Sequence, residues 1–481
     1  MNESGPRHLH PGTIIVGFIK ALPRQIIAAI ALAAFLSKFG FVTATLIFLA
    51  IVAIVIAFRA LAWWRFTYNV LPDELTIQSG VFSRNKRSIP WDRVQDVDIE
   101  RDMFARVFGW AKVKLETGGA GQDEGGLDSI AIKDAEALRA LVRSRRSGAL
   151  IASATDEEAT EPKPVIAFAM PPRRLLQAGL FNFSLLWLAI LYGIGHQIDR
   201  ALPYDWDDLL RWLGLNENRI FGLLNPVLIG SAFGLFLILG VLSGIAQMVV
   251  TNFGFRLSVE GNGLRRVRGL FTRTEIIIPR KRVQVVIVTR NWLARRFGFA
   301  RIAVQTMAAL GRRAGGKQDL APLANGAETS HVLTLAGNFN EPQLAEFQPV
   351  APAHVWIGVI MLTLFPALII LGNALFKPML LWLMLLVPLS GGLAWLTRRP
   401  HAWVITEAVL AIRRGWFGQD HILIPLRNIQ SLRLTSGPIQ RRAGLASILI
   451  DTAGASPQGH SLSNLPHETA RQVLNDLRAS R

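Results

Sequence analysis

A threefold repeat without gaps constrains this chain more than any other feature. Each copy has a Gly, a Pro ten residues later, a second Gly nineteen residues after the Pro, and a Thr eight residues after that. The four positions are Gly80, Pro90, Gly109 and Thr117 in the first copy; Gly269, Pro279, Gly298 and Thr306 in the second; and Gly415, Pro425, Gly444 and Thr452 in the third. Because the spacing is kept without insertion, the sequence predicts three copies of one folding unit.

Each copy has the pattern of a small β-rich domain. Short β-prone segments, such as residues 74–79 and 94–99, are separated by turn signals, and each copy ends in a segment with helical period. The first Gly is expected in a turn with positive φ, and the second Gly is expected to cap a short helical turn. A Phe two residues after the first Gly is expected to anchor each core; these are Phe82, Phe271 and Phe417.

Long apolar segments alternate with the three copies. Hydrophobic residues make up 51% of the 481 residues and the mean hydropathy is +0.33, which is typical of a protein with membrane spans. Six segments are candidate spans: residues 24–38, 41–64, 175–198, 221–250, 354–371 and 379–396. The predicted unit is therefore a pair of membrane helices followed by one β-rich domain, repeated three times.

This pattern predicts the following division of the chain. Membrane helix pairs are expected at residues 1–64, 173–250 and 349–399, β-rich domains at 65–148, 251–348 and 400–481, and an acidic linker at 149–172. The formal net charge is +18, and Lys and Arg gather before the first and third spans and after the sixth. By the positive-inside rule we expect a multi-pass protein of the cytoplasmic membrane, with both termini and all three domains in the cytoplasm.

These residues resemble one known family. A strand-rich domain with a C-terminal helix, flanked by paired spans and carrying Gly-x-Phe, Ile-Pro, Arg-Val-Gln and Phe-Gly-aromatic-Ala in that order, is similar to the bacterial pleckstrin-homology (PH), or membrane-flanked, domain family of the YdbT-like type. The resemblance implies two packed antiparallel sheets capped by a C-terminal helix, with no established chemistry. It also implies a connection with envelope stress or resistance to antimicrobial compounds.

Some repeated polar residues are candidate contacts with lipid headgroups or a partner. One group is the Arg-x-Gln motif, and a second is an Arg that precedes the second Gly; the second copy adds a third group of basic residues. The residues are Arg93, Gln95, Arg282, Gln284 and Gln430; Arg106, Arg295 and Arg441; and Arg265, Arg266 and Arg268. A structural alternative exists for each group: Gln can satisfy a loop backbone, Arg can stabilise a helix end, and a basic face can simply be solvated. In the third copy Asn428 replaces the Arg of the motif.

Several functional classes are disfavoured. There is no Cys, the nine His show no metal-ligand spacing, and no hydrolase motif occurs, so we expect no catalytic site, cofactor or metal. Residues 311–317 match the start of a phosphate-binding loop, but Gln318 replaces the Ser or Thr that would bind Mg²⁺. No nucleic-acid recognition motif is present. The sequence predicts an integral membrane scaffold or interaction protein, with a protein partner or homo-oligomer; the alternative is anionic-lipid binding or lipid handling.

Small residues in the fourth candidate span form a further pattern. Gly230 and Gly234, and then Gly240 and Gly244, are each separated by three residues. This spacing allows helices to approach closely. Packing within the chain and contact between subunits both remain open as explanations.

Overall fold

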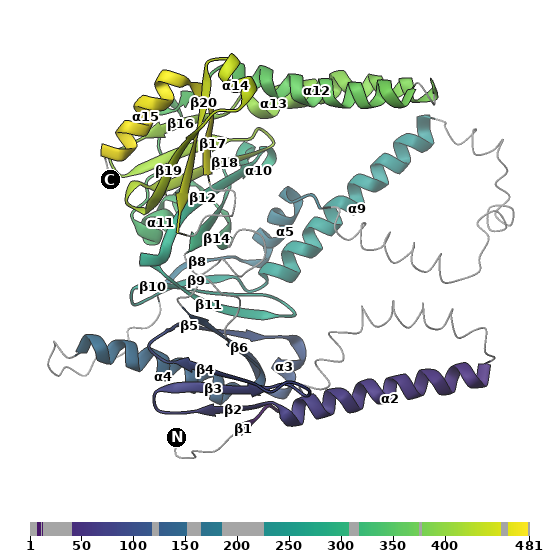
Figure 1. Ribbon diagram of the computed structural model, residues 1–481, viewed down its shortest axis with the longest axis vertical. Helices are drawn as coiled ribbons and strands as arrows, with labels where there is room; N and C mark the ends of the chain where they lie inside the picture. Colours follow the sequence, from purple (N-terminus) through teal and green to yellow (C-terminus); the bar gives the residue numbers. More distant parts are fainter. Residues whose placement is uncertain are drawn as a thin grey trace.

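Three β-rich domains form one column, from which long apolar helices project on the same side (Figure 1). The computed structural model describes residues 7–10, 12, 41–117, 125–151, 165–184, 226–306, 317–374, 378–453 and 460–479, and the structural statements below concern these residues. Each domain has seven antiparallel strands and a C-terminal helix. The predicted fold class, PH-like domains combined with apolar helices, is confirmed.

The strands follow the same order in each domain. Domain 1 contains β1 (Arg7–His8), β2 (Thr67–Val70), β3 (Glu74–Ser79), β4 (Asn85–Pro90), β5 (Val94–Arg101), β6 (Trp110–Thr117), β7 (Gly125–Ala131) and helix α4 (Ile132–Ile151). Domain 2 contains β8 (Val165–Ala169), β9 (Arg256–Glu260), β10 (Gly263–Arg268), β11 (Arg273–Pro279), β12 (Val283–Asn291), β13 (Ala300–Thr306), β14 (Lys317–Ala324) and helix α11 (Gly326–Gly337). Domain 3 contains β15 (Gln348–Pro349), β16 (Ala402–Ile405), β17 (Val409–Arg414), β18 (Gly418–Pro425), β19 (Ile429–Thr435), β20 (Leu445–Thr452), β21 (His460–Pro466) and helix α15 (His467–Ala479).

The first strand of every domain comes before the apolar segments in the chain. β1 pairs with β2, β8 with β9, and β15 with β16, so in each case the helical region is inserted between two neighbouring strands of one sheet. The segment predicted as a linker, residues 149–172, therefore contains β8, a strand of domain 2. Such short strands are difficult to predict because their partners lie far away in the sequence.

Two of the sheets are shared between neighbouring domains. One seven-stranded sheet has the order β7-β6-β5-β11-β10-β9-β8 and combines strands of domains 1 and 2. The other has the order β14-β13-β12-β18-β17-β16-β15 and combines strands of domains 2 and 3. A four-stranded sheet, β1-β2-β3-β4, lies at one end of the column, and a three-stranded sheet, β19-β20-β21, lies at the other. The domains are thus joined by backbone hydrogen bonds rather than by linkers alone.

The shared sheet of domains 2 and 3 forms a wall between two hydrophobic cores. Val286 and Val288 of β12 pack into the core of domain 2, whereas Val285 and Ile287 pack into the core of domain 3. All four side chains are buried. Because successive residues of a strand point to opposite faces, β12 is apolar on both faces. Substantial burial therefore holds domains 2 and 3 together.

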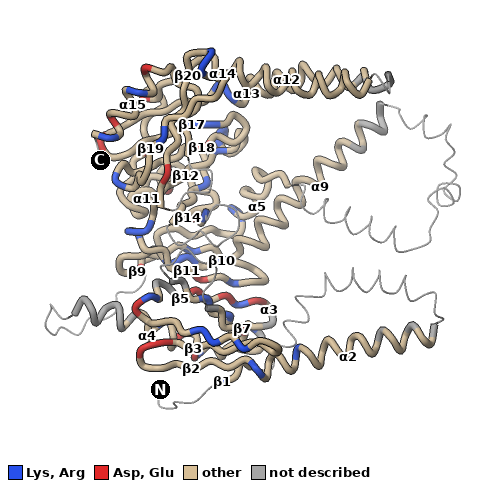
Figure 2. Tube along the Cα trace, viewed as in Figure 1, with Lys and Arg blue, Asp and Glu red and all other residues tan. Residues whose placement is uncertain are grey.

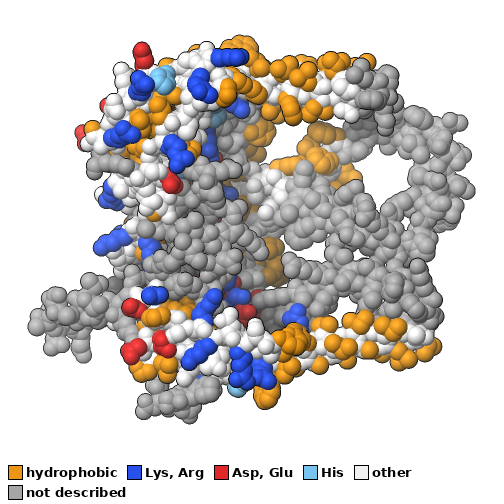
Figure 3. All heavy atoms as spheres, viewed as in Figure 1, with side chains coloured by type: hydrophobic (Ala, Val, Ile, Leu, Met, Phe, Trp, Pro, Cys, Tyr) orange, Lys and Arg blue, Asp and Glu red, His pale blue; other side chains and the backbone are white. Residues whose placement is uncertain are grey.

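Within the described residues, three helices are long and apolar enough to cross a membrane. They are α2 (Phe41–Arg65), α9 (Pro226–Asn252) and α12 (Ala353–Ala374). A shorter apolar segment, η5 (Pro378–Leu385) followed by α13 (Leu386–Arg398), lies beside α12. Exposed hydrophobic side chains cover α2 and α12 (Figure 3), and charged residues are concentrated in the β-rich column (Figure 2). This distribution is what contact with lipid requires.

Two of the six predicted spans need comment. The segment at residues 24–38 lies outside the described residues. The span predicted from residue 175 is wrong at its start, because helix α5 (Pro172–Phe181) is amphipathic and buries Leu175 and Ala178 in the core of domain 2. These apolar residues serve a domain core rather than a lipid contact. Residues 185–225 are outside the description.

The repeated glycines behave as predicted, but the repeated Phe residues do not. The first Gly of each copy has a φ between 82° and 115°, and the second has a φ between 65° and 75°. In contrast, Phe82, Phe271 and Phe417 are 92%, 50% and 59% exposed, so the prediction that they anchor cores is wrong. The tight Gly turn carries each ring beyond the end of its sheet. The ring of Phe82 instead stacks on Phe58 of α2, with centroids 5.9 Å apart.

The small residues of α9 explain how α5 docks on it. A Cβ atom at Gly244 would lie 2.0 Å from the Asn182 carbonyl oxygen, whereas a Cβ at Gly234 would meet no described atom within 4 Å. We expect Gly244→Val to lower the free energy of unfolding by about 1–3 kcal/mol through overpacking. Thermal unfolding of the full chain in detergent measures this, with Gly234→Val as the matched control. Equal losses in the two variants would contradict the packing role of Gly244.

Candidate functional site at the domain junctions

Both junctions use one strand register. β5 pairs with β11 at the first junction, and Arg101 lies opposite Arg273. β12 pairs with β18 at the second junction, and Arg290 lies opposite Gln419. Arg101 and Arg290 occupy the same position in the repeat, as do Arg273 and Gln419. The chain therefore makes the same domain contact twice.

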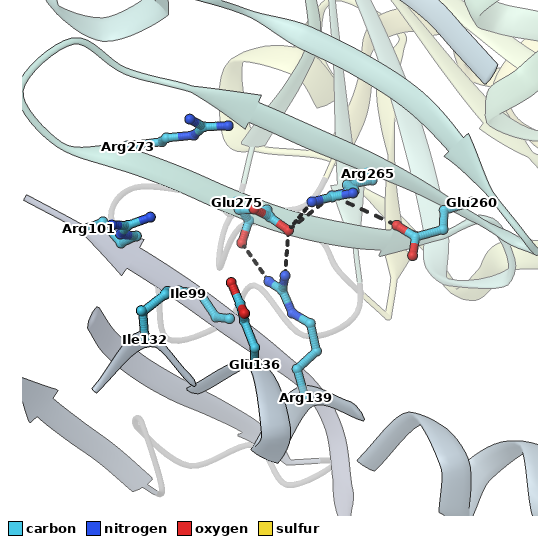
Figure 4. Close-up of a pocket in the computed structure, with 9 residues that line it drawn as sticks. All are labelled: Ile99, Arg101, Ile132, Glu136, Arg139, Glu260, Arg265, Arg273 and Glu275. Atoms are coloured by element: carbon cyan, nitrogen blue, oxygen red, sulfur yellow. Dashed lines mark hydrogen bonds and ion pairs between the residues drawn. The ribbon is translucent and has the colours of Figure 1, made fainter. Parts of the chain in front are cut away.

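Ion pairs reinforce the first junction. Arg139 of α4 in domain 1 forms an ion pair with Glu275 of β11 in domain 2, and it also donates to the carbonyl oxygen of Val97 at 3.2 Å (Figure 4). Arg265 lies 2.7 Å from the same carboxylate, and the Nε atom of Arg265 also lies 3.8 Å from the carboxylate of Glu260. Burial alone would raise the pKa of Glu275, but the two guanidinium groups lower it below its usual value. The cluster lines a cavity of about 440 Å³.

A half-buried carboxylate reinforces the second junction. Glu341 follows α11 and accepts hydrogen bonds from Arg290 of domain 2, with one Nη2–Oε2 distance of 2.7 Å, and contacts the Nδ1 atom of His421 in domain 3. Burial raises the pKa of Glu341, but the hydrogen bonds and charges of Arg290 and His421 outweigh it and hold the pKa at about 2. Glu341 is therefore ionised at neutral pH and connects the two domains.

The repeated Arg before the second Gly also reaches across the junctions. Arg106 of domain 1 donates to the carbonyl oxygen of Leu270 in domain 2 at 2.9 Å. Arg295 of domain 2 donates to the Oε1 atom of Gln419 in domain 3 at 3.0 Å. Arg441, the third copy, is exposed and has no partner among the described residues. The recurrence of this Arg thus follows from contact with the next domain.

The Arg-x-Gln positions lie at the same junctions. Asn428, which replaces the Arg in the third copy, donates to the carbonyl oxygens of Val283 and Gln284 in domain 2 at 3.1 Å each. Asn428, the residue that departs from the motif, therefore joins domain 3 to domain 2. The predicted residues differ in exposure: Arg93 and Gln430 are exposed, Arg282 is half-buried, Gln284 is buried, and the side chain of Gln95 is outside the description.

The extra arginines of the second copy are largely held within domain 2. Arg266 is 2% exposed and donates to the backbone carbonyl oxygen of Asp319 at 2.9 Å. Arg268 and Arg301 form ion pairs with the Asp319 carboxylate at 2.9 and 2.7 Å. Burial raises the pKa of Asp319, but Arg301, Arg268 and Arg266 lower it below the usual value. Arg266 cannot meet an external ligand from this buried position, which corrects its assignment as a surface contact.

A second cavity at the first junction is basic and lies at the end of α9. Its volume is about 460 Å³, and five Arg side chains line it together with Ser258 and apolar groups; no Asp or Glu of the described residues does so. The arginines are Arg106, Arg256, Arg265, Arg268 and Arg273. Arg256 and Arg273 are exposed, and neither has a partner among the described residues. Phe253, the first residue after α9, lines the same cavity and is 45% exposed.

No group of three potential metal ligands occurs in the described part of the chain. The segment that resembles a phosphate-binding loop, residues 311–317, lies outside the described residues except for Lys317, which begins β14.

Comparison with protein families identifies the repeating unit. The model of the bacterial PH domain matches residues 21–146, 210–335 and 356–481. This chain belongs to the bacterial PH domain family. Each match covers apolar residues as well as the PH domain that follows them, in agreement with the unit found from the sequence.

One curated relative matches over almost its full length. The chain is 23% identical over 472 residues to the UPF0699 transmembrane protein YdbT of Bacillus subtilis (strain 168), and the alignment covers 94% of each chain. No solved structure matches the chain. The relative's name agrees with the apolar helices described above in indicating a membrane protein.

Sequence reasoning missed two residues that are prominent at the PH domain junctions, Glu341 and Arg256. Glu341 lies in the segment after α11 and belongs to no repeated motif. Arg256 and Arg273 lie on β9 and β11, one on each side of the strand that carries Arg265 and Arg268. The signal that could have indicated Arg256 is its position just after a predicted span, where a cation meets the headgroup region.

Proposed function

We propose that this bacterial PH domain protein binds anionic lipid headgroups in the basic cavity between PH domains 1 and 2. The observation that carries this proposal is the pair of exposed arginines, Arg256 and Arg273. Neither has a partner among the described residues, and they line a cavity to which no described Asp or Glu contributes. A guanidinium group presents donors in a planar fork that fits phosphate oxygens. A phosphate group would supply the negative charge that this cavity does not contain.

The place of the cavity relative to the spans supports a lipid ligand. Phe253 and Gly254, which directly follow α9, line it together with Ile166, an exposed apolar side chain. If α9 spans the membrane, the cavity opens at the depth of the headgroups. Apolar lining groups would then contact the upper acyl chains while the arginines hold the phosphate.

Exposed aromatic side chains near the other spans support a PH column that rests on the membrane surface. Trp292 begins helix α10 (Trp292–Arg296) and Phe297 follows it; they are 49% and 61% exposed, and Phe82 stacks on Phe58 of α2. Aromatic rings are favoured at the membrane–water interface. The Lys and Arg distribution along the sequence favours a cytoplasmic location for all three domains and a multi-pass topology.

The headgroup proposal predicts a loss of affinity in a double variant. We expect Arg256→Gln combined with Arg273→Gln to weaken binding of a short-chain phosphatidylglycerol by about tenfold or more, because two charge-assisted contacts are removed. Isothermal titration of the full chain in neutral detergent measures the affinity, with a phosphatidylcholine of the same chain length as the reference lipid.

The matched control replaces two exposed arginines of domain 3, Arg427→Gln and Arg471→Gln, and should leave the affinity unchanged. Equal affinity for the two lipids, or an unchanged affinity in the Arg256 and Arg273 double variant, would refute the proposal.

A second candidate function is that of a non-catalytic scaffold. The shared sheets favour it, because backbone pairing fixes the three PH domains relative to one another and presents one continuous surface to a partner. A role in envelope stress, expected from the family resemblance, remains a prediction. Growth of a deletion strain under antimicrobial challenge, with and without the Arg256 and Arg273 double variant, would test that role.

A further inference from the structure

The two ends of the PH column carry complementary unpaired edges. Within the described residues, β4 is the last strand of the four-stranded sheet and β19 is the first strand of the three-stranded sheet. β4 occupies the repeat position of β11 and β18, and β19 occupies the position of β5 and β12. At both internal junctions, a strand of the β19 type pairs with a strand of the β4 type. One strand of each type is therefore left without a described partner strand, β4 at one end of the column and β19 at the other.

Side chains near β19 are those that a further domain would cover. Gln284 on β12 is 6% exposed next to domain 3, whereas the equivalent Gln430 on β19 is exposed. Arg106 and Arg295 each reach the next domain, whereas Arg441 has no partner among the described residues. Gln430 and Arg441 are thus counterparts of groups that contact the next domain elsewhere in the chain, but here no next domain is present.

Apolar groups at both ends of the column are also open. Ile439 in α14 (Pro438–Arg442) is 47% exposed, and Phe82, in the turn before β4, is 92% exposed. At the second internal junction the residues beside these positions meet: Trp292 contacts Phe417 edge to face, with ring centroids 6.1 Å apart. Phe417 is the equivalent of Phe82, and Trp292 lies beside the equivalent of Ile439. Both rings stay half exposed at the internal junction, at 59% and 49%, so contact between the two ends would cover the apolar groups in part.

We propose that β19 of one copy pairs with β4 of a second copy, so that copies of this chain join head to tail. The register of the internal junctions places Thr435 opposite Asn85, Leu434 opposite Lys86, and Arg433 opposite Arg87 of the second copy. Such a contact is heterologous, so it extends into a row of molecules or closes into a ring. The proposal is independent of headgroup binding.

The arrangement of the helices is compatible with this contact. α2, α9 and α12 project from the same side of the column although two junctions lie between them (Figure 1). Repeating the same junction once more therefore keeps the helices of the second copy on that side. No internal junction of the described residues pairs two strands of the β19 type, so a contact between the β19 strands of two copies has no precedent in this chain.

Charge sets the strength of the contact. Arg433 would face Arg87, and like charges in directly opposite positions of a sheet are unfavourable. The first internal junction tolerates such a pair, because Arg101 lies opposite Arg273. We therefore expect a weak association that becomes stronger at higher ionic strength, where repulsion between exposed charges is screened.

Disulfide crosslinking tests the proposal directly, because the chain contains no cysteine. At the second internal junction Thr289 donates to Asp420 at 2.7 Å, and this pair is equivalent to Thr435 and Asn85. The full chain with Thr435→Cys and Asn85→Cys, oxidised in native membranes, is expected to form a ladder of covalent oligomers. The variant with Thr289→Cys and Asp420→Cys should form a disulfide within one chain. Its two sulfur atoms then no longer react with a maleimide-linked polymer, so the mobility shift that the polymer causes on a gel is absent.

Charge reversal supplies a second measurement. Arg433→Glu, added to the Thr435 and Asn85 cysteine pair, should increase the oligomeric fraction at low salt by about threefold or more, because an attractive pair replaces a repulsive one. Arg433→Lys is the control and should leave the fraction unchanged. Intact internal crosslinking in the Arg433→Glu background shows that the variant is folded.

Three outcomes would overturn the proposal. One is the absence of a ladder in the double-cysteine chain at both low and high salt while the internal pair crosslinks. Another is a dimer formed by Thr435→Cys alone, which would show that two β19 edges meet. The last is a ladder that does not respond to Arg433→Glu, which would indicate random collision in the membrane.

Discussion

Replacing Asp319 with alanine is expected to lower the free energy of unfolding of PH domain 2 by about 3–5 kcal/mol. Asp319 is buried and holds Arg268 and Arg301 by ion pairs, while its backbone oxygen holds the buried Arg266. Arg301 is exposed, so its charge is solvated, but removing the carboxylate leaves the buried Arg266 and the half-buried Arg268 without compensation in a region of low dielectric constant. Denaturant unfolding of the full chain in detergent, followed through tryptophan fluorescence, measures the loss.

Two further variants make this prediction specific. Asp319→Asn keeps the size of the side chain but removes the charge, so its effect should fall between that of wild type and that of Asp319→Ala. Asp451→Ala removes an exposed carboxylate of PH domain 3 and should change stability by less than about 0.5 kcal/mol. If Asp319→Ala were as mild as Asp451→Ala, the ion cluster would not be a determinant of stability.

Replacing Glu341 with glutamine is expected to weaken the junction of PH domains 2 and 3 in a pH-dependent way. The pKa of Glu341 is about 2 in the folded protein, against 4.5 for an unperturbed glutamate. Because the folded pKa is the lower one, the ionised carboxylate stabilises the protein above about pH 4.5, and this contribution is lost as the pH falls toward 2. The difference corresponds to about 3 kcal/mol.

The measurement is the stability difference between wild type and Glu341→Gln at several pH values. We expect a difference of about 3 kcal/mol at pH 7 that shrinks steadily below pH 4.5. Glu346→Gln alters an exposed carboxylate of the same segment and should show no such dependence. A difference that stays constant from pH 7 to pH 3 would mean that Glu341 acts through packing rather than through its charge.

Local features of the fold could be predicted from the sequence. The positive φ of Gly269 depends on its own turn, and the helices α2, α9 and α12 depend on local apolar composition, so a short window contains the information. The short strands β1, β8 and β15 could not be found in this way. Each pairs with a strand beyond a long apolar region, and nothing in two to five residues indicates a distant partner.

The shared sheets left a signal in the sequence that the repeat pattern obscured. In β12 four consecutive residues, 285–288, are apolar, which is typical of a strand buried on both faces. The equivalent residues of β19 alternate, with Arg433 between Leu432 and Leu434. Comparing the copies for their differences would therefore have identified β12 as a covered strand. It would not have identified β5, whose residues 96–99 alternate although β5 pairs with β11.

The candidate site was predicted in part. Recurrence correctly selected Arg106 and Arg295 as residues with a role beyond their own turn, but it could not name their partners, because Leu270 and Gln419 belong to the next domain. Arg256 and Arg273 belong to no motif and meet only when β9, β10 and β11 form a sheet. Their significance depends on tertiary arrangement and on the absence of carboxylates from the cavity lining.

The insertion of a helical region between two paired strands has a consequence for biogenesis. β8 and β9 are hydrogen-bonded neighbours, so they must end on the same face of the bilayer, and an even number of crossings must separate them. The same parity holds for β1 with β2 and for β15 with β16. If each inserted region crosses the bilayer as a pair of helices, a PH domain of this chain can be completed only after that pair has been inserted correctly. Formation of the sheet would then act as a checkpoint, because an incorrectly inserted helix pair would leave one of the two pairing strands on the wrong side of the membrane.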